Sequence, residues 1–445
     1  MSDAPSKDFY SEKLVEVNKT NSVVATQNIY NEQGALIVPE GASISAETAK
    51  RIALHKLNQP LELSVSVETT VTRQDMVKEL GTLPSSPELV EIFTSELSTR
   101  LFKEAVVQLD QYPLVVQKLT VMRQCLPGCY KNAILGAAVS AQICDGLKLP
   151  LEERNAVFIA ALVRDIGLLH IDPAVAVKEY GYTASEWNLY KGHVAVAYHL
   201  LGLENNIPKL TKQAVLEHHE RADGFGYPRG KVWPALSLAG QIVAFADMAV
   251  VLAERYVVRL GYSTRALAPI VQLNANQHTP EVASAALSQL ARLAGPRKLL
   301  YSKADVPRVR RQLCCAHPLV SLLAKQIEEF WVFLKQLVPH LELTAIENAL
   351  NDLRNCVASS GVYESVIVQW VRELDPDEVQ DDDLLEIENY GLMLGECAWK
   401  FSQLFQSFVT FPDSHQIDAV SAEQIRGKYQ DIEKTASLLQ KVRKS

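Results

Sequence analysis

Two adjacent histidines, His218 and His219, stand immediately before a loop that is rich in glycine. Imidazole nitrogens are good ligands for transition metals, so the pair is a candidate metal site. The loop then carries Tyr227 and Arg229, which offer an aromatic face and a guanidinium group that can bind a phosphate through two hydrogen bonds. Glycines let the loop backbone turn sharply. These residue types predict a metal centre beside a loop that binds a phosphate-bearing ligand or a partner protein.

Other short motifs occur in a definite order around this stretch. They are Arg164-Asp165-Ile166-Gly167, Thr183 with Glu186 and Trp187, Lys191-Gly192-His193, His218-His219-Glu220-Arg221, Gly226-Tyr227-Pro228 and Ala246-Asp247. Together they resemble the signature of HD-GYP domains, the bacterial phosphodiesterases that hydrolyse cyclic di-GMP at a two-metal site. The resemblance implies an all-helical core of the HD type.

The resemblance also implies which residues hold metal. One ion of the family takes ligands at the positions of Asp165, His193, His218 and His219, and all four are present here. Three neutral imidazoles and one carboxylate suit Fe, Mn or Zn. The other ion shares Asp165 and takes a second carboxylate, which corresponds to Asp247.

This second half of the site departs from the family. Arg164 stands where the family has the histidine of its His-Asp pair, and a guanidinium cannot bind a metal ion. Asn132 stands near the expected place of an upstream histidine, and no histidine lies between His55 and His170. Leu168 replaces a lysine that contacts substrate phosphate in the family. The resemblance therefore implies one complete half-site and one that has lost both histidines.

Two-metal hydrolysis uses ions roughly 3.5–4 Å apart to activate water and stabilise the displaced oxygen. We therefore expect at most one transition metal ion here, or none, and we predict that hydrolysis is lost or vestigial. No residue is assigned a catalytic role in this interpretation. The predicted contact for a nucleotide or a partner is the loop, with Arg221, Gly226, Tyr227, Pro228 and Arg229 as its binding residues.

Structural interpretations of the same residues compete with this one. The two histidines could simply end a helix, with one imidazole buried and one exposed. A buried Asp247 would need a partner, and Arg164 could supply it, which would turn a metal site into a buried ion pair. His170 matches no ligand position of the family, and we expect it to be structural.

Composition limits the class of function. The chain has 445 residues, 48% of them hydrophobic and 22% charged, and a formal net charge of −8. The acidic balance argues against nucleic acid as a partner. The N-terminus lacks the apolar core of a signal peptide, and no apolar run is long enough to span a membrane. An odd number of cysteines, 7, with irregular spacing predicts thiols in a reducing cytoplasm.

The predicted fold is mainly α, and the chain divides into four segments. Residues 1–68 are expected to form a small α+β domain, with β-type runs at 23–26 and 35–38 joined through a turn at 31–34, a helix that opens at 43–45 and runs through 57, and a strand at 61–67. Residues 69–120 are a helical connector, and 121–295 form the degenerate HD-GYP domain. Residues 296–445 form a C-terminal helical region whose last helix is expected to start at a capping box formed by Ser421 and Gln424.

Three functions follow from these observations. The first is a catalytically impaired signalling protein in a cyclic di-GMP pathway, which binds cyclic di-GMP or a diguanylate cyclase-type protein. The second is an active, metal-dependent cyclic di-GMP phosphodiesterase with a reduced metal site. The third is a structural helical scaffold without a ligand. The sequence leaves the oligomeric state open.

Overall fold

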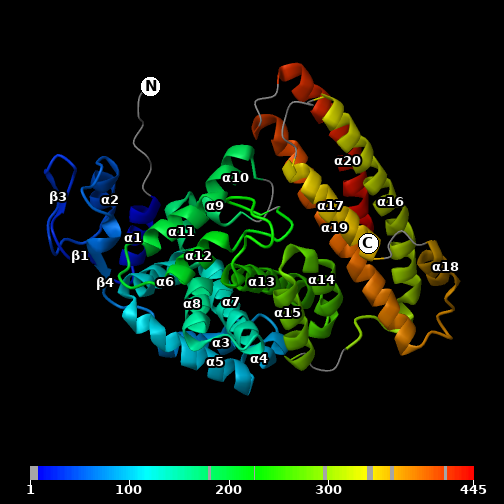
Figure 1. Ribbon diagram of the computed structural model, residues 1–445, viewed down its shortest axis with the longest axis horizontal. Coiled ribbons are helices and arrows are strands. Elements are labelled where there is room, and N and C mark those ends of the chain that lie inside the picture. The colour runs from blue at the N-terminus through cyan, green and yellow to red at the C-terminus, as the bar shows by residue number, and fades with distance from the viewer. Residues whose placement is uncertain are drawn as a thin grey trace. The chain divides into compact units, whose positions relative to one another are not determined.

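A computed structural model describes residues 9–178, 182–224, 226–293, 298–337, 344–360, 365–414 and 418–444. The protein is mainly helical, with short strands only near the N-terminus of this described part (Figure 1). The predicted mainly α fold class with small N-terminal strands is thus confirmed. The chain divides into two compact units. The first comprises residues 1–220, 227–229 and 235–252, and the second comprises 221–226, 230–234 and 253–445.

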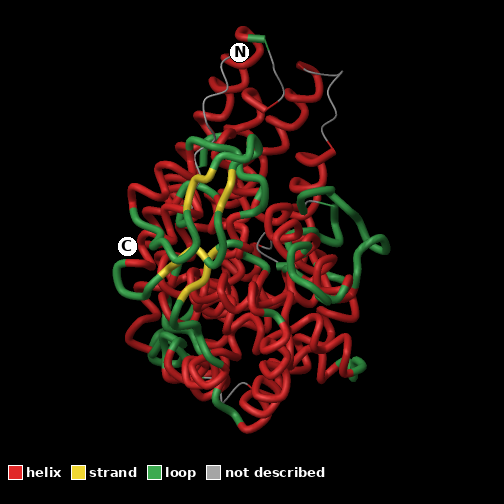
Figure 2. Tube along the Cα trace, turned by 90° about the vertical axis from the view of Figure 1, so that its left-hand side faces the viewer, coloured by secondary structure: helices red, strands yellow, loops and turns green. Residues whose placement is uncertain are grey.

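The N-terminal part of the first unit combines two helices with two small antiparallel strand pairs, which Figure 2 shows in yellow. Its elements are α1 (Phe9–Asn18), β1 (Val23–Ala25), β2 (Ile29–Tyr30), β3 (Leu36–Val38), α2 (Ala46–Ala53), the 3-10 turn η1 (Leu61–Leu63) and β4 (Val65–Val67). Strand β1 pairs with β4, and β2 pairs with β3. The inward-facing residues Val23, Ala25, Val65 and Val67 are buried, which is the alternation expected of a strand with one covered face.

Three details of this segment differ from the prediction. The turn at 31–34 joins β2 to β3 and not the two predicted strands, because residues 29–30 form a strand of their own. Helix α2 is capped by the Ser45 side chain but ends at Ala53, before the predicted Leu57. The predicted strand at 61–67 begins with a 3-10 turn, and only Val65–Val67 is extended.

The rest of the first unit is a helical core. Its helices are α3 (Arg73–Thr82), α4 (Pro87–Phe93), α5 (Glu96–Val106), η2 (Val107–Gln111), α6 (Pro113–Cys125), α7 (Pro127–Gly146), α8 (Leu151–Val163), η3 (Ile166–His170), α9 (Pro173–Ala176), α10 (Ala184–Lys191), α11 (His193–Leu201), α12 (Lys209–Glu217) and α13 (Leu238–Leu252). Helices α7, α8, α12 and α13 pack closely on one another. Every residue of α8 from Ala156 to Val163 is buried. The residues that follow α8 are therefore attached to a closely packed helix.

The second unit holds the remaining helices. They are the π-helical η4 (Ala253–Arg259), η5 (Thr264–Ala266), α14 (Leu267–Leu273), η6 (Ala275–Gln277), α15 (Pro280–Leu293), η7 (Lys303–Asp305), α16 (Val306–Leu337), α17 (Thr344–Ser359), α18 (Ser365–Glu373), α19 (Asp381–Ser414) and α20 (Ala419–Lys444). The long helices α16, α17, α19 and α20 share one apolar core. Figure 1 draws these helices in yellow to red. Trp331 belongs to that core.

The start of the last helix also differs from the prediction. Helix α20 begins at Ala419, so Ser421 lies inside its first turn and does not cap it. Asp418 caps the helix instead, because its carboxylate accepts hydrogen bonds from the Val420 and Ser421 amides. Within the described part of the chain, no helix combines the length and apolar character that crossing a membrane requires. The four-segment division of the chain stays a proposal, and its boundary at 295/296 falls outside the described residues.

Candidate metal centre

Three helix ends of the first unit present the predicted ligands. Asp165 follows α8 and immediately precedes η3, and His193 is the first residue of α11. His218 and His219 come directly after α12. Residues separated by more than 50 positions in the sequence thus meet at one point.

The four predicted ligands form a single group in which one ligand atom of each residue lies within 4.8 Å of the others. The His193 Nε2 atom lies 3.5 Å from His218 Nε2 and 3.5 Å from Asp165 Oδ1. The His218 Nε2 atom lies 3.8 Å from the same carboxylate oxygen. Donor atoms about 2 Å from a common ion are spaced roughly 3–4 Å apart. The group therefore has a spacing suited to a single metal ion.

The backbone orients two of these histidines. The Nδ1 atom of His193 lies 2.6 Å from the Tyr190 carbonyl, and that of His218 lies 2.6 Å from the Val215 carbonyl. A carbonyl only accepts, so each Nδ1 carries the proton and each Nε2 presents a lone pair to the centre of the group. The Nε2 atom of His219 is buried and has no hydrogen-bond partner among the described residues. A metal ion would satisfy this orphaned atom, so the residues fit the ion that the sequence predicts.

Electrostatics keep the group in its metal-binding form. Burial lowers the pKa of His218 to about 3 and also holds the pKa values of His193 and His219 below the ordinary value. Burial alone would raise the pKa of Asp165, but the Arg164 guanidinium, His218 and His193 together outweigh it and lower that pKa. At neutral pH the group therefore contains neutral imidazoles and a carboxylate, which are the protonation states that a metal requires.

Arg164 lies beside the four grouped ligands and pairs with two carboxylates. Its side chain is fully buried and lies between two carboxylates, with Nη2 2.8 Å from Asp247 Oδ1 and Nε 3.2 Å from Asp165 Oδ2. It also donates to the carbonyl oxygens of Ala161 at 2.7 Å and Asn132 at 3.2 Å. Asn132 thus contacts Arg164 through its backbone carbonyl. Asp247 pairs with the guanidinium and is not one of the four grouped ligands.

Gly136, for which the sequence predicts no role, makes room for this arginine. A Cβ atom at Gly136 of α7 would lie 2.8 Å from Arg164 Nη1, so any larger residue there would displace the guanidinium. The sequence does contain a signal, because a glycine in the interior of a helix costs about 1 kcal/mol relative to alanine and calls for a reason. Gly167 of η3 allows a close backbone contact with His193, since a Cβ at this position would lie 2.0 Å from the His193 carbonyl oxygen.

Leu168, at the position where the family has a phosphate-contacting lysine, is buried. Leu168 lies in η3 and is 2% exposed, so it belongs to the core of the first unit. An apolar side chain is suited to that place, whereas a lysine there would have to turn its ammonium group out of the core.

The predicted binding loop splits into buried and exposed parts. The Tyr227 ring packs against His219, with 4.6 Å between ring centroids, and against Trp187, at 5.7 Å. Pro228 and Arg229 are exposed, and Gly226 is half-buried. Arg221 forms an ion pair with Asp223. Burial raises the pKa of Tyr227 well above its ordinary value, so the phenol stays neutral. Of these predicted binding residues, Arg229 is therefore the charged group most accessible to a ligand.

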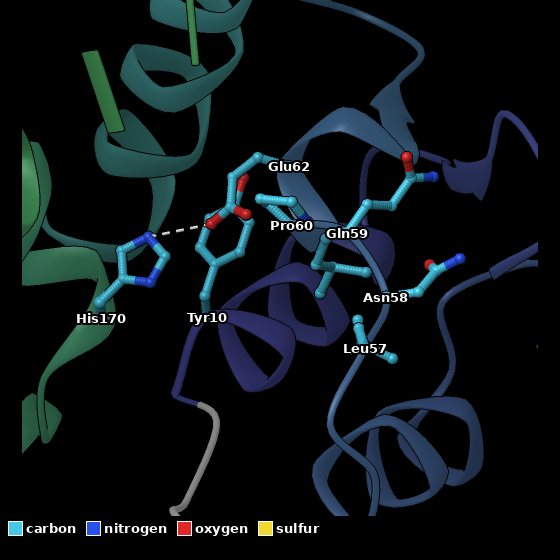
Figure 3. Close-up of a pocket in the computed structure, with 8 residues that line it drawn as sticks. Tyr10, Leu57, Asn58, Gln59, Pro60, Glu62 and His170 are labelled. Atoms are coloured by element: carbon cyan, nitrogen blue, oxygen red, sulfur yellow. Dashed lines mark ion pairs between the residues drawn. The ribbon is translucent and has the colours of Figure 1, made fainter. Parts of the chain in front are cut away.

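His170 lies in a separate ion cluster. The buried Lys118 ammonium lies 3.0 Å from Glu62 Oε1 and 3.0 Å from His170 Nε2, and the His170 ring stacks on Tyr10. Figure 3 shows the pocket beside this cluster, whose lining includes Tyr10, Glu62 and His170 and none of the four grouped ligands. The cluster ties the N-terminal part of the first unit to η3, in agreement with the structural role expected for His170.

Comparison with known proteins agrees with this geometry. Residues 110–296 match the HD domain family. Over 111 residues the chain is 37% identical to the cyclic di-GMP phosphodiesterase response regulator RpfG of Xanthomonas campestris pv. campestris, which is 25% of this chain and 29% of that protein. Over 89 residues it is 37% identical to a cyclic di-GMP phosphodiesterase of Thermotoga maritima, 20% of this chain and 24% of that protein. The 3'3'-cGAMP-specific phosphodiesterase 1 of Vibrio cholerae is 32% identical over 112 residues, 24% of this chain and 26% of that protein.

The chain spans less than a third of the length of each of these relatives. Residues 110–296 match an HD domain with distant similarity to cyclic dinucleotide phosphodiesterases, and they contain a His/Asp group that could hold a metal ion. These findings favour the predicted alternative, a phosphodiesterase with a reduced metal site, over the predicted loss of hydrolysis. The loss of hydrolysis itself stays a prediction.

Proposed function

We propose that this chain is a metal-dependent cyclic dinucleotide phosphodiesterase whose site holds one metal ion and takes cyclic di-GMP as substrate. The observation that carries the proposal is the closed group of Asp165, His193, His218 and His219, with two Nε2 atoms oriented by backbone carbonyls and a third left without a partner. A bound divalent ion would polarise a phosphoryl oxygen and acidify water. Similarity to phosphodiesterases of two cyclic dinucleotides supports the substrate class.

Two arginines supply positive charge to the site and its loop. Arg164 places a fixed positive charge between Asp165 and Asp247 and compensates both carboxylates. A single ion beside a guanidinium lacks the second Lewis acid of a two-metal site, so turnover is expected to be slow. Arg229 on the exposed part of the loop is suited to a substrate phosphate.

The second candidate function is binding of cyclic di-GMP, or of a diguanylate cyclase-type protein, without hydrolysis. The burial of Arg164 favours it, because a guanidinium bonded to two carboxylates and two carbonyls fills the place that a second ion would need. In this case the surviving half-site and the loop would serve recognition alone.

A turnover assay with matched variants distinguishes the two functions. Wild type, His218→Ala and His199→Ala are each incubated with Mn²⁺ or Fe²⁺ and with cyclic di-GMP or 3'3'-cGAMP, and linear products are separated by chromatography. His199 is an exposed residue of α11 and serves as the control. The proposal expects slow metal-dependent turnover that is retained in His199→Ala and lost in His218→Ala.

Binding without products in wild type, measured by calorimetry, would establish the second candidate. Neither binding nor products, with no metal retained, would leave the structural scaffold as the remaining interpretation.

A further inference from the structure

A network of buried polar side chains in the second unit ends at the loop that follows the paired histidines. Its centre is Glu396 of α19, a carboxylate that is 1% exposed. The Tyr256 hydroxyl donates to Glu396 Oε2 at 2.7 Å, and the Asn274 amide donates to Glu396 Oε1 at 2.9 Å. Burying a carboxylate is costly unless hydrogen bonds or charges compensate it. Arg255 adds a positive charge to this arrangement, since its Nη1 atom lies 3.7 Å from Glu396 Oε2.

The network continues from Asn274 towards the loop. The Gln277 side-chain amide donates to Asn274 Oδ1, and both residues are buried. The Gln277 backbone carbonyl accepts from the Ala222 amide at 2.9 Å. The Ala222 carbonyl in turn accepts from the Trp233 amide at 3.2 Å, and Asp223 forms an isolated β-bridge with Val232. The two stems of the loop are thus joined to each other and to the end of η6.

The residues of this network come from different parts of the chain. Ala222 follows the predicted ligands His218 and His219 by only a few positions, whereas Glu396 lies 122 residues beyond Asn274. Residues 256–277 fall inside the segment that matches the HD domain family, and Glu396 falls outside it. The long helix α19 therefore supplies the central acceptor for a loop that belongs to the HD segment.

We propose that Glu396 is a positioning residue for the loop at 221–234, acting through Asn274 and Gln277. The two carboxylate oxygens of Glu396 accept hydrogen bonds from Tyr256 and Asn274. Asn274 in turn bonds to Gln277, whose backbone carbonyl accepts from the Ala222 amide. This inference assigns a role to the C-terminal helical region: it sets the conformation of the stems from which Tyr227 and Arg229 are presented. It rests on the proposed function in so far as the loop is the ligand contact.

The test uses full-length protein and two variants that interrupt the network at different points. Glu396→Gln replaces one acceptor oxygen by a donor, and Asn274→Ala removes the link between α19 and η6. Glu386→Gln, on the exposed face of the same helix, is the matched control. Hydrogen exchange followed by mass spectrometry reports on peptides covering 221–234 and, as an internal reference, on α12.

Both network variants are expected to exchange about tenfold faster than wild type in residues 221–234, which corresponds to ~1.4 kcal/mol of lost local stability. Exchange in α12 and the retained Mn²⁺ should not change, because the four grouped ligands are not part of the network. Glu386→Gln should behave as wild type. If Asn274→Ala does not fold, the isosteric Glu396→Gln variant decides the question.

Calorimetry with cyclic di-GMP then connects the loop to binding, and the dissociation constant should rise about tenfold in the two variants. Unchanged exchange at 221–234 in folded variants would overturn the inference. If wild type binds no cyclic di-GMP, the proposed function fails, while the exchange result still decides whether Glu396 positions the loop.

Discussion

Replacing Arg164 by methionine tests whether a buried ion pair has taken the place of the second metal ion. The side chain is fully buried and compensates Asp247 and Asp165 while donating to two backbone carbonyls. Methionine keeps much of the volume but leaves the two carboxylates without their cation. Removing one partner of a buried ion pair typically costs about 3–5 kcal/mol, so we expect a loss of that size at pH 7.

A control variant and a second substitution make this prediction specific. Arg154 lies in α8 as well, but its pair with Asp145 at 3.5 Å is partly exposed, so Arg154→Met should cost less than ~1 kcal/mol. Adding Asp247→Asn to Arg164→Met removes one of the uncompensated charges and should restore part of the lost stability. A double variant that is less stable than Arg164→Met alone would contradict this electrostatic explanation.

The measurement must follow the first unit by itself, because a chain with two compact units need not unfold in one step. Hydrogen exchange of peptides from α7 and α8 in increasing urea reports the stability of the helices around Arg164. The expected result is a lower urea midpoint for these peptides in Arg164→Met and an almost unchanged one in Arg154→Met. A cost within ~1 kcal/mol for Arg164→Met would refute the view that this guanidinium holds the half-site together.

Three further outcomes are expected. Elemental analysis of protein purified without chelator should find no more than one equivalent of Fe, Mn or Zn per chain, since the four grouped ligands fit a single ion; two tightly held equivalents would contradict this. Arg229→Ala should raise the dissociation constant for cyclic di-GMP by roughly 10- to 100-fold without affecting folding, because a lost charge-assisted hydrogen bond costs about 1.5–3 kcal/mol and Arg229 is exposed; Lys209→Ala, another exposed cation, should change it little. Burial and then Lys118 lower the pKa of His170 to about 3 from its ordinary 6.5, so the unfolded chain takes up this proton at higher pH than the folded protein. Because of His170, the free energy of unfolding should fall as the pH is lowered from 6.5 to 3, by up to ~1.4 kcal/mol per pH unit. In urea unfolding, the free energy of His170→Gln should depend less steeply on pH than that of wild type.

The sequence alone determined the chemistry of the candidate site. The ordered motifs resemble those of HD-GYP domains, and this resemblance implied Asp165, His193, His218 and His219 as one ligand set. The helical character of the chain was equally readable, since apolar periodicity is a local property. The sequence did predict the turn at 31–34, but it did not predict which strands pair, because strand pairing depends on the whole N-terminal segment.

Only the tertiary structure decided what each charged group faces. The pairing of Arg164 with Asp247 joins positions 83 residues apart, and the sequence left it as one of two interpretations. The fit of Arg164 against Gly136, and the link from Glu396 to the loop stem, depend on how separate helices pack. Close contacts of this kind arise from the shape of the whole core, which motif spacing cannot encode. The sequence thus specified the candidate ligands, while packing determined that Asp247 pairs with Arg164 and that Asp165 contacts both Arg164 and the imidazoles.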